Sequence, residues 1–135
     1  MSAARDLQAA IIAALKSDTE LVTLLGDTDR IVDRVPPGRD FPFVAIGRTS
    51  VQDWSTDDHA GEEHILTLRC WSRVTSRDEV LAMAEHVSAA LEGLAGIHGE
   101  TRIVSFVPVS FDHGYEPADR AWRTSLRFRA LTEAA

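Results

Sequence analysis

Cysteine is nearly absent from this chain, and long apolar runs are absent as well. Cys70 is the single cysteine among 135 residues, so no intramolecular disulfide can form. It stands in an alternating apolar pattern, where we expect a buried and unreactive thiol. No apolar run approaches the ~18 residues of a membrane span. Asp6 and Gln8 interrupt the N-terminal stretch, which we interpret as a helix of the mature protein rather than a signal peptide. These features fit a protein that folds in a reducing cytosol.

Basic residues are few, and lysine is almost missing. The chain has 14 basic and 21 acidic residues, a formal net charge of −7. A general nucleic-acid binder needs a basic surface that releases counterions, so that class is disfavoured. Lys16 is the one lysine, and the other basic residues are arginines, which suit bidentate pairing at interfaces. A GC-rich genome would produce the same bias, and we place that explanation first.

Catalytic motifs are missing too. The chain has no phosphate-binding loop, dinucleotide fingerprint, GxSxG elbow or HExxH motif. Asp112 and His113 stand beside a glycine, as expected of a turn. Four residues are the conceivable metal ligands, but their spacing matches no common site: Asp57, Asp58, His59 and His64. We therefore expect no enzyme activity, no metal and no cofactor.

The remaining composition is that of one ordinary globular domain. Hydrophobic residues make up 44% of the chain and charged residues 26%. A chain of this length matches the usual ~100–200 residues per domain. It can bury roughly two thirds of its unfolded surface without disulfides. We expect a single domain over residues 1–135.

Three helices are predicted from apolar residues at helical spacing. The first spans roughly residues 3–16. "SDTE" at residues 17–20 has the pattern of a capping box and opens a short second helix, which Gly26 ends. Ser76 and Glu79 repeat the capping pattern ahead of a third helix that reaches about Glu92. Its apolar side consists of Val80, Ala84, Val87 and Leu91, with Met83, Ala90 and Leu94 adjoining.

Five strands are predicted around these helices: residues 30–34, 43–51, 64–73, 101–111 and 121–132. Gly47 indicates a bulge or a close backbone approach, and Pro108 an edge position or an irregularity. The strand at 101–111 has Ile103, Val107, Val109 and Phe111 on one face and Val104 and Phe106 on the other. That pattern suggests cover on both sides, and residues 112–120 are expected to form the following turn.

The predicted element order is α-α-β-β-β-α-β-β. Hairpin runs with helices set apart indicate an α+β domain with a mainly antiparallel sheet of about four to five strands. The helices are expected to cover the apolar face of that sheet.

Two charged surfaces remain as candidate sites. Residues 53–63 form a predicted solvated loop whose acidic residues are Asp53, Asp57, Asp58, Glu62 and Glu63. In "HILTLRCWSR", residues 64–73, Trp71 shares a strand face with Arg69 and Arg73. A second strand presents Arg123, Arg127 and Arg129 on one face.

These strand faces have two interpretations. They are either a solvated outer face or a protein–protein interface, for which Trp and Arg are the enriched residue types. Trp54, beside the acidic loop, favours an interface. An acidic loop on one subunit and an arginine face on the next would be complementary in a repeating assembly.

The ordered series of motifs resembles a known family. A helix precedes "LVTLLGDTDRIVDRVPPGRDFPFVAIG", an acidic break precedes "EEHILTLRCWSR", and "SRDEVLAMAEHVSAAL" follows. This series, over roughly residues 7–131, is similar to the tail-completion, or tail-terminator, family of long-tailed phages and phage-derived gene transfer agents. The pieces that carry the resemblance are Leu25-Gly26, Arg30-Ile31, Pro36-Pro37 through Pro42-Phe43, Ile46-Gly47 and Trp71-Ser72-Arg73.

The resemblance implies a small α+β subunit that assembles into a ring, typically a homohexamer. Such a ring sits on the head-proximal end of the tail tube, stops tube polymerisation and presents a surface to the head connector. It is assembled in the bacterial host cytoplasm and becomes part of a virion or phage-like particle. Its partners would be further copies of itself, the tail tube protein and the connector proteins, with DNA passing only transiently through the lumen and no membrane. An acidic protein suits such a channel because acidic walls do not hold phosphates.

Two alternatives stay open. One is a head-side adaptor or stopper protein of the neck. The other is a small dimeric α+β enzyme or ligand-binding domain with an interior pocket. The sequence weighs against the second because no titratable group clearly points inward.

Overall fold

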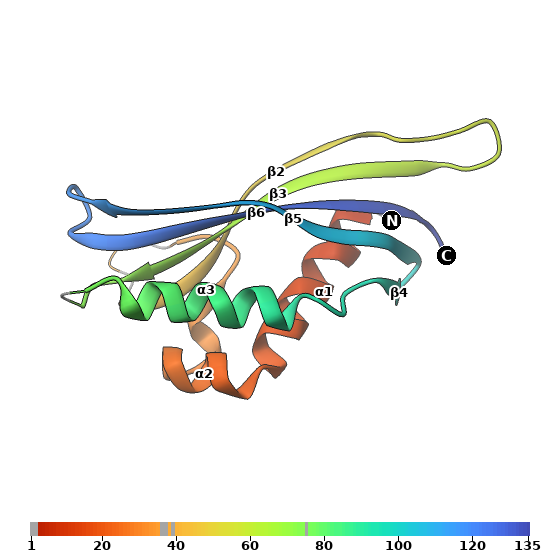
Figure 1. The fold of residues 1–135 in the computed structure, drawn as a ribbon. Helices are drawn as coiled ribbons and strands as arrows, with labels where there is room; N and C mark the ends of the chain where they lie inside the picture. Colours follow the sequence, from red (N-terminus) through yellow and green to blue (C-terminus); the bar gives the residue numbers. More distant parts are fainter. Residues whose placement is uncertain (1–2, 36–37, 39, 75) are drawn as a thin grey trace.

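The computed structural model describes residues 3–35, 38, 40–74 and 76–135, and within them three helices lie on one side of a six-stranded sheet (Figure 1). Pro36 and Pro37, which belong to the motifs that carry the family resemblance, lie outside the described residues. No helix of the described part is long and apolar enough to cross a membrane. The helices are α1 Ala3–Ser17, α2 Thr19–Leu25 and α3 Asp78–Ala90, and a short 3-10 turn covers Thr28–Arg30. The strands are β1 Ile31–Val32, β2 Phe43–Asp53, β3 Gly61–Ser72, β4 Gly96–His98, β5 Thr101–Glu116 and β6 Ala121–Ala134.

The three helices occur where their apolar spacing predicts them, but neither capping box forms. Asp18, not Ser17, caps α2, because its carboxylate accepts a hydrogen bond from the Leu21 backbone N–H at 2.9 Å. Helix α3 has no side-chain cap, and Glu79 instead accepts from the Ser72 hydroxyl at 2.7 Å. Gly26 ends α2 in the left-handed conformation, with φ at 99°, as predicted.

The sheet order is β1-β2-β3-β6-β5-β4, and it differs from the predicted sheet in two ways. It has six strands rather than four to five, because β4 is an additional three-residue strand beside β5. It is also mixed, since β1 pairs with β2 in parallel. The other pairs are antiparallel. The α+β class itself is confirmed.

Bulges reset the alternation of side chains along two strands. In β2 the register shifts between Ile46 and Thr49, at the glycine predicted to cause it. In β5 the register shifts at Val104 and again at Val109. Each extra residue moves the following side chains to the opposite face. The predicted faces of β5 are therefore wrong: Phe106 lies with Ile103 and Phe111 on the helix side, and Val107 lies on the other side.

Two long hairpins extend from the helix-covered part of the sheet in opposite directions (Figure 1). One is the end of β2 with the start of β3, which we call the acidic arm, residues 51–63. The other is β5 with β6, which turns at residues 117–120. The predicted turn at residues 112–120 is thus too long, because the strand continues to Glu116.

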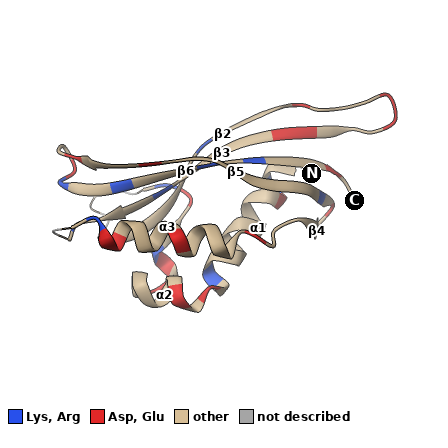
Figure 2. Ribbon diagram, in the orientation of Figure 1, with Lys and Arg blue, Asp and Glu red and all other residues tan. Residues whose placement is uncertain are grey.

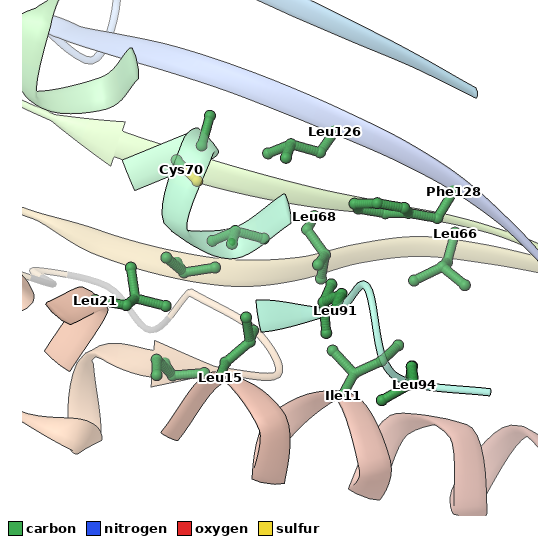
Figure 3. Packing of buried hydrophobic residues seen from close by; sticks show 14 of the residues in the cluster. Ile11, Leu15, Leu21, Leu66, Leu68, Cys70, Leu91, Leu94, Leu126 and Phe128 are labelled. Carbon is green, nitrogen blue, oxygen red and sulfur yellow. The ribbon is translucent and has the colours of Figure 1, made fainter. Parts of the chain in front are cut away.

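The core lies between the helices and one face of the sheet (Figure 3). Leu66, Leu68 and Cys70 of β3 alternate into it, together with Leu126 and Phe128 of β6. Ile11 and Leu15 of α1 and the predicted side of α3 cover these strands. Burial raises the pKa of the Cys70 thiol to about 12, which makes it an unreactive core residue as predicted.

Candidate assembly surface

The helix-free face of the sheet carries the candidate arginines. The cross-strand pairs Trp71–Arg123, Arg69–Ser125, Thr67–Arg127 and Ile65–Arg129 lie in successive rows on this face of β3 and β6. Figure 2 shows basic positions along β6 and acidic positions on the arm, at its tip and on β3. The structure therefore brings the predicted arginines of the two strands together on one surface.

Trp71 lies at one end of this face in a cluster of aromatic side chains. Its ring stacks on Phe43, with centroids 6.2 Å apart, and meets Phe41 edge-on at 6.4 Å. Arg73 places its guanidinium 4.1 Å from the centroid of Phe41 and donates two hydrogen bonds to the Asp119 carbonyl. Trp71 is half-buried by these neighbours. It is covered in part by its own chain, namely by Phe41 before β2 and by Phe43 at the start of β2.

Two of the arginines are neutralised within the subunit. Arg123 donates to the Glu116 carboxylate at 2.7 Å and lies 3.6 Å from that of Asp112. Arg129 meets Glu63 at 2.5 Å, and Gln52 donates to the same carboxylate at 2.6 Å. These hydrogen bonds, that of Arg129 above all, lower the pKa of Glu63. The predicted turn residue Asp112 is in fact a strand residue that helps to hold Arg123.

Arg127 and Arg69 have surroundings that differ from those of Arg123 and Arg129. Arg127 is exposed in the middle of the face, and no acidic partner for it occurs among the residues that the structure describes. Arg69 is half-buried, with its guanidinium against Gly47, where an added Cβ would come within 2.5 Å of its Nη1 atom. An unpaired arginine on an outer strand face is available for a partner's carboxylate.

The acidic arm ends in a tight, fully exposed turn. The Trp54 backbone N–H donates to the Gly61 carbonyl at 2.8 Å, and that of Thr56 to the His59 carbonyl at 2.8 Å. Asp53 accepts hydrogen bonds from Ser55, which lower the pKa of its carboxyl. The Trp54 side chain is 41% exposed, so a large aromatic surface stands beside Asp57 and Asp58. The predicted solvated tip is confirmed, although Glu62 and Glu63 belong to strand β3.

The histidines near these surfaces have structural partners. His64 is buried, and its Nε2 lies 2.9 Å from the Thr132 hydroxyl. Desolvation lowers the pKa of His64. The Nδ1 atom of His113 lies 2.7 Å from the Thr124 hydroxyl, within the β5–β6 hairpin. Among the described residues, no three His, Cys, Asp or Glu gather in a way that could hold a metal ion.

The sequence pattern misses one surface, the outer edge of β5. Four of its apolar side chains are between 42% and 53% exposed: Val104, Val107, Val109 and Phe111. Tyr115 is 49% exposed further along the same strand. The expected cover on both sides of this strand is therefore wrong. The edge position that Pro108 indicated is confirmed, since β4 pairs with β5 only at residues 101–103. Proline is tolerated at sheet edges because it lacks a backbone donor.

Three hollows on the described part of the molecule are too small or too open to enclose a ligand. One of about 80 Å³ lies between α1 and β2 and is lined by Leu7, Ile11, Ile46 and Leu66 among others. Two larger ones, of about 320 Å³ at the base of the arm and about 450 Å³ beside Asp29 and Arg34, open to the surface. The first is far smaller than the ~300–1,000 Å³ of small-molecule sites. The more prominent surfaces are the arginine face, the acidic arm and the β5 edge.

Comparison with known proteins connects these surfaces to one class. A chain in the solved structure "Virion of native gene transfer agent (GTA) particle" has the same fold, with a TM-score of 0.81 and 28% sequence identity. The match covers 93% of each chain. The sequence profile of the family described as tail completion protein gp17 matches residues 9–133. No curated protein matches the chain in a sequence search.

These matches define the class as a structural protein of phage or gene-transfer-agent tails. Within that class, the chain belongs to the tail completion protein gp17 family. The resemblance found in the sequence is thereby confirmed over nearly the whole chain.

Proposed function

We propose that this protein is a tail terminator: a homo-oligomeric ring, hexameric by analogy with its family, on the head-proximal end of a tail tube. The ring ends tube polymerisation and joins the tail to the head connector. Membership of the tail completion family over residues 9–133 is the observation that carries this proposal. The likeness to a chain of a gene transfer agent virion supports a place in a particle with other tail proteins. The protein acts without catalysis and without a cofactor.

The contacts of the ring are assigned to the helix-free face and the acidic arm. Arg127, with Arg69 beside it, offers positive charge on the face, while Trp54, Asp53, Asp57 and Asp58 project on the arm. Opposite charges on two separated parts of one subunit favour contacts between copies, or between a copy and the tube. Trp71 and Arg73 extend the same face at its far end. Arg123 and Arg129 are part of the face, but their charges are already compensated by Glu116 and Glu63.

Passage of DNA agrees with the charge of the chain. At a net charge of −7, a ring of identical subunits is strongly acidic as a whole. Phosphates are repelled by such a wall, so a DNA strand can move through without being held. We therefore assign DNA the role of a transient passenger rather than a ligand.

A head-side adaptor of the neck is the nearest alternative, because it would use the same kinds of surface. It differs in its partner: an adaptor binds the connector but not the free end of a tube. The other alternative, a dimeric enzyme or ligand-binding domain, is disfavoured by hollows that are small or open to the surface and by the missing catalytic motifs.

The mass of the protein in solution tests the proposal. We expect sedimentation or native mass spectrometry to give a closed ring, either alone or after the tube protein of the same particle is added. Binding to tube ends should be visible in the same mixtures. A stable dimer that does not bind tubes would contradict the proposal. Binding to the connector alone would favour the adaptor.

A further inference from the structure

Each side of the sheet has a long strand edge with no outer neighbour in the described residues. Strand β1 pairs with β2 only at Val44 and Ala45, so β2 is free over residues 46–53. Strand β4 pairs with β5 only over residues 101–103, so β5 is free over residues 104–116. Free edges of this kind present backbone donors and acceptors that can pair with another strand.

A row of the sheet consists of the residues that are directly paired across β2, β3, β6 and β5. The two free edges occupy the same rows. Following the cross-strand pairs, Ile46 of β2 lies in one row with Phe111 of β5, and Val51 lies in one row with Phe106. Strands β1 and β4 stand at opposite ends of this common window, so neither covers it. One bulge interrupts each edge beside the row that contains Thr67, at Gly47–Arg48 in β2 and at Val109 in β5.

The side chains of the two edges also match. On the helix side, each edge carries an exposed apolar side chain in this window, Val51 on β2 at 44% exposure and Phe111 on β5 at 42%. On the helix-free side, both carry small hydroxyl side chains, Ser50 on β2 and Ser110 on β5. Exposed Arg48 lies two pairs from the row of Asp112, whose side chain is 76% exposed. Joining the edges would cover apolar surface and bring opposite charges together.

We propose that the free edge of β5 pairs in antiparallel fashion with the free edge of β2 in a second copy, so that the sheet continues from subunit to subunit. Three antiparallel steps, β2 to β3 to β6 to β5, leave the two edges running in opposite directions. Copies related by rotation about one axis therefore meet with antiparallel strands and with their helices on the same side. A contact between two different edges repeats head to tail and closes into a ring. This proposal rests on the proposed ring and adds a contact between the strand edges of neighbouring copies to those of the helix-free face and the acidic arm.

Both edges have structural features that restrict pairing with another strand. Bulges, and in β5 also Pro108, discourage a regular strand from adding to an edge. The edge of a second copy has its own bulge in the same row, so it can pair along the irregular part of the first edge. The second copy is therefore favoured over an arbitrary extended peptide.

Engineered cysteine pairs test the contact, because the native Cys70 is fully buried. Ser50 and Val107 are exposed and share one row, so S50C and V107C would face each other across the joined edges. Directly opposite residues in antiparallel strands lie about 4.5–5.5 Å apart between Cα atoms, which is within disulfide range. Oxidation of the double variant should give a ladder of covalent multimers that ends at the closed ring. Pairing S50C with Ser105→Cys or Ser110→Cys detects a register shifted by two residues.

Control variants separate this contact from chance collisions. The pair S50C and Glu85→Cys places the second thiol at an exposed position of helix α3 and should give no ladder. S50C alone should give no dimer, whereas a symmetric β2–β2 contact would produce one. Val109→Lys, at a side chain 53% exposed on the β5 edge, should abolish multimers and leave the unfolding midpoint nearly unchanged. Ile97→Lys, 58% exposed on β4 outside the window, should preserve them.

The outcomes distinguish the contact from the function. If the wild-type protein forms rings but no cysteine pair gives a ladder and Val109→Lys assembles normally, the edge pairing is wrong and the ring stands. If the wild-type protein stays monomeric with and without the tube protein, the ring itself fails. A ladder in the in-row pair with loss of rings in Val109→Lys supports both.

Discussion

The guanidinium of Arg129 and the carboxylate of Glu63 lie 2.5 Å apart, although 66 residues separate them in the sequence. Because Gln52 donates to the same carboxylate, the cluster ties β2, β3 and β6 together where the acidic arm leaves the sheet. One arginine and one acid of the two candidate surfaces thus compensate each other inside the subunit. Arg127, two positions along β6, is left for contacts outside it.

Replacing Glu63 with Gln should weaken the acid sensitivity of the arm. The pKa of Glu63 is lowered in the folded protein, so its contribution to stability is present above its ordinary pKa of 4.5 and is lost as the pH falls through the folded value. Thermal unfolding measured between pH 3 and pH 7 should therefore show a shallower acid decline in Glu63→Gln than in the wild type. Equal slopes would mean that the pair contributes nothing to folding.

His64 should make stability depend on pH in a higher range. The pKa of this buried histidine is lowered from its ordinary value of 6.5, so the unfolded chain binds a proton that the folded one excludes. Stability should be fully present above about pH 6.5 and should fall as the pH drops through the folded pKa. His64→Gln, which keeps a polar group toward Thr132, should remove this component from a series of urea unfolding curves. An unchanged pH profile would contradict the assignment.

Two glycines form a matched pair for testing the end of α2. Gly26 has φ at 99°, a conformation that L side chains rarely adopt, whereas Gly93 has ordinary φ and open space around it. Gly26→Ala should therefore cost about 1 kcal/mol of unfolding free energy. Gly93→Ala should change it by less than ~0.5 kcal/mol. Urea denaturation measures both, and equal effects would count against the left-handed cap.

Trp71→Ala should leave a folded monomer and impair assembly. The side chain is half-buried against Phe41 and Phe43, so we expect a loss of about 1–3 kcal/mol rather than the ~3–5 kcal/mol of a fully buried tryptophan. Phe43→Leu is the control: it weakens the same cluster from a side chain that is only 2% exposed. Circular dichroism reports folding, and ring mass or tube binding reports assembly. If Trp71→Ala unfolds, or if both variants assemble equally poorly, Trp71 serves the subunit rather than the interface.

Charge reversal of Arg127 should disrupt assembly without affecting folding. The residue is exposed and makes no ion pair with the described acidic residues, so Arg127→Glu breaks no salt bridge among them. Arg5→Glu changes the net charge equally from an exposed position on α1 and should assemble normally. Titration of each variant against tubes, read by sedimentation, gives the comparison. Equal binding by the two variants would exclude the arginine face from the contact.

Helices and core strands of this protein could be predicted from the sequence because periodicity reports which side chains are buried. Leu66, Leu68 and Cys70 alternate into the core as expected, and so does the predicted side of α3. The predicted faces of strand β5 were wrong for a local reason. The bulges at Val104 and Val109 interrupt the two-residue alternation that the prediction took to be continuous. Strand β4 was missed because three residues carry too little pattern to be seen.

The candidate surfaces were predicted in part. Trp71, Arg69 and Arg127 do share the helix-free face, since β3 and β6 keep a regular register throughout. The compensation of Arg129 by Glu63 could not be foreseen, because it joins residues from distant strands. Capping boxes failed where a nearby competitor was available: Asp18 caps α2, and Ser72 binds Glu79.

Growth of tail tubes in the presence of the protein tests the central claim most directly. Tube protein of the same particle is allowed to polymerise with increasing amounts of the chain, and tube lengths are measured by electron microscopy. We expect tubes that carry a ring at one end, stop growing there and become shorter as the chain is added. Tubes of unregulated length with bare ends at saturating amounts of the chain would contradict its role as a terminator.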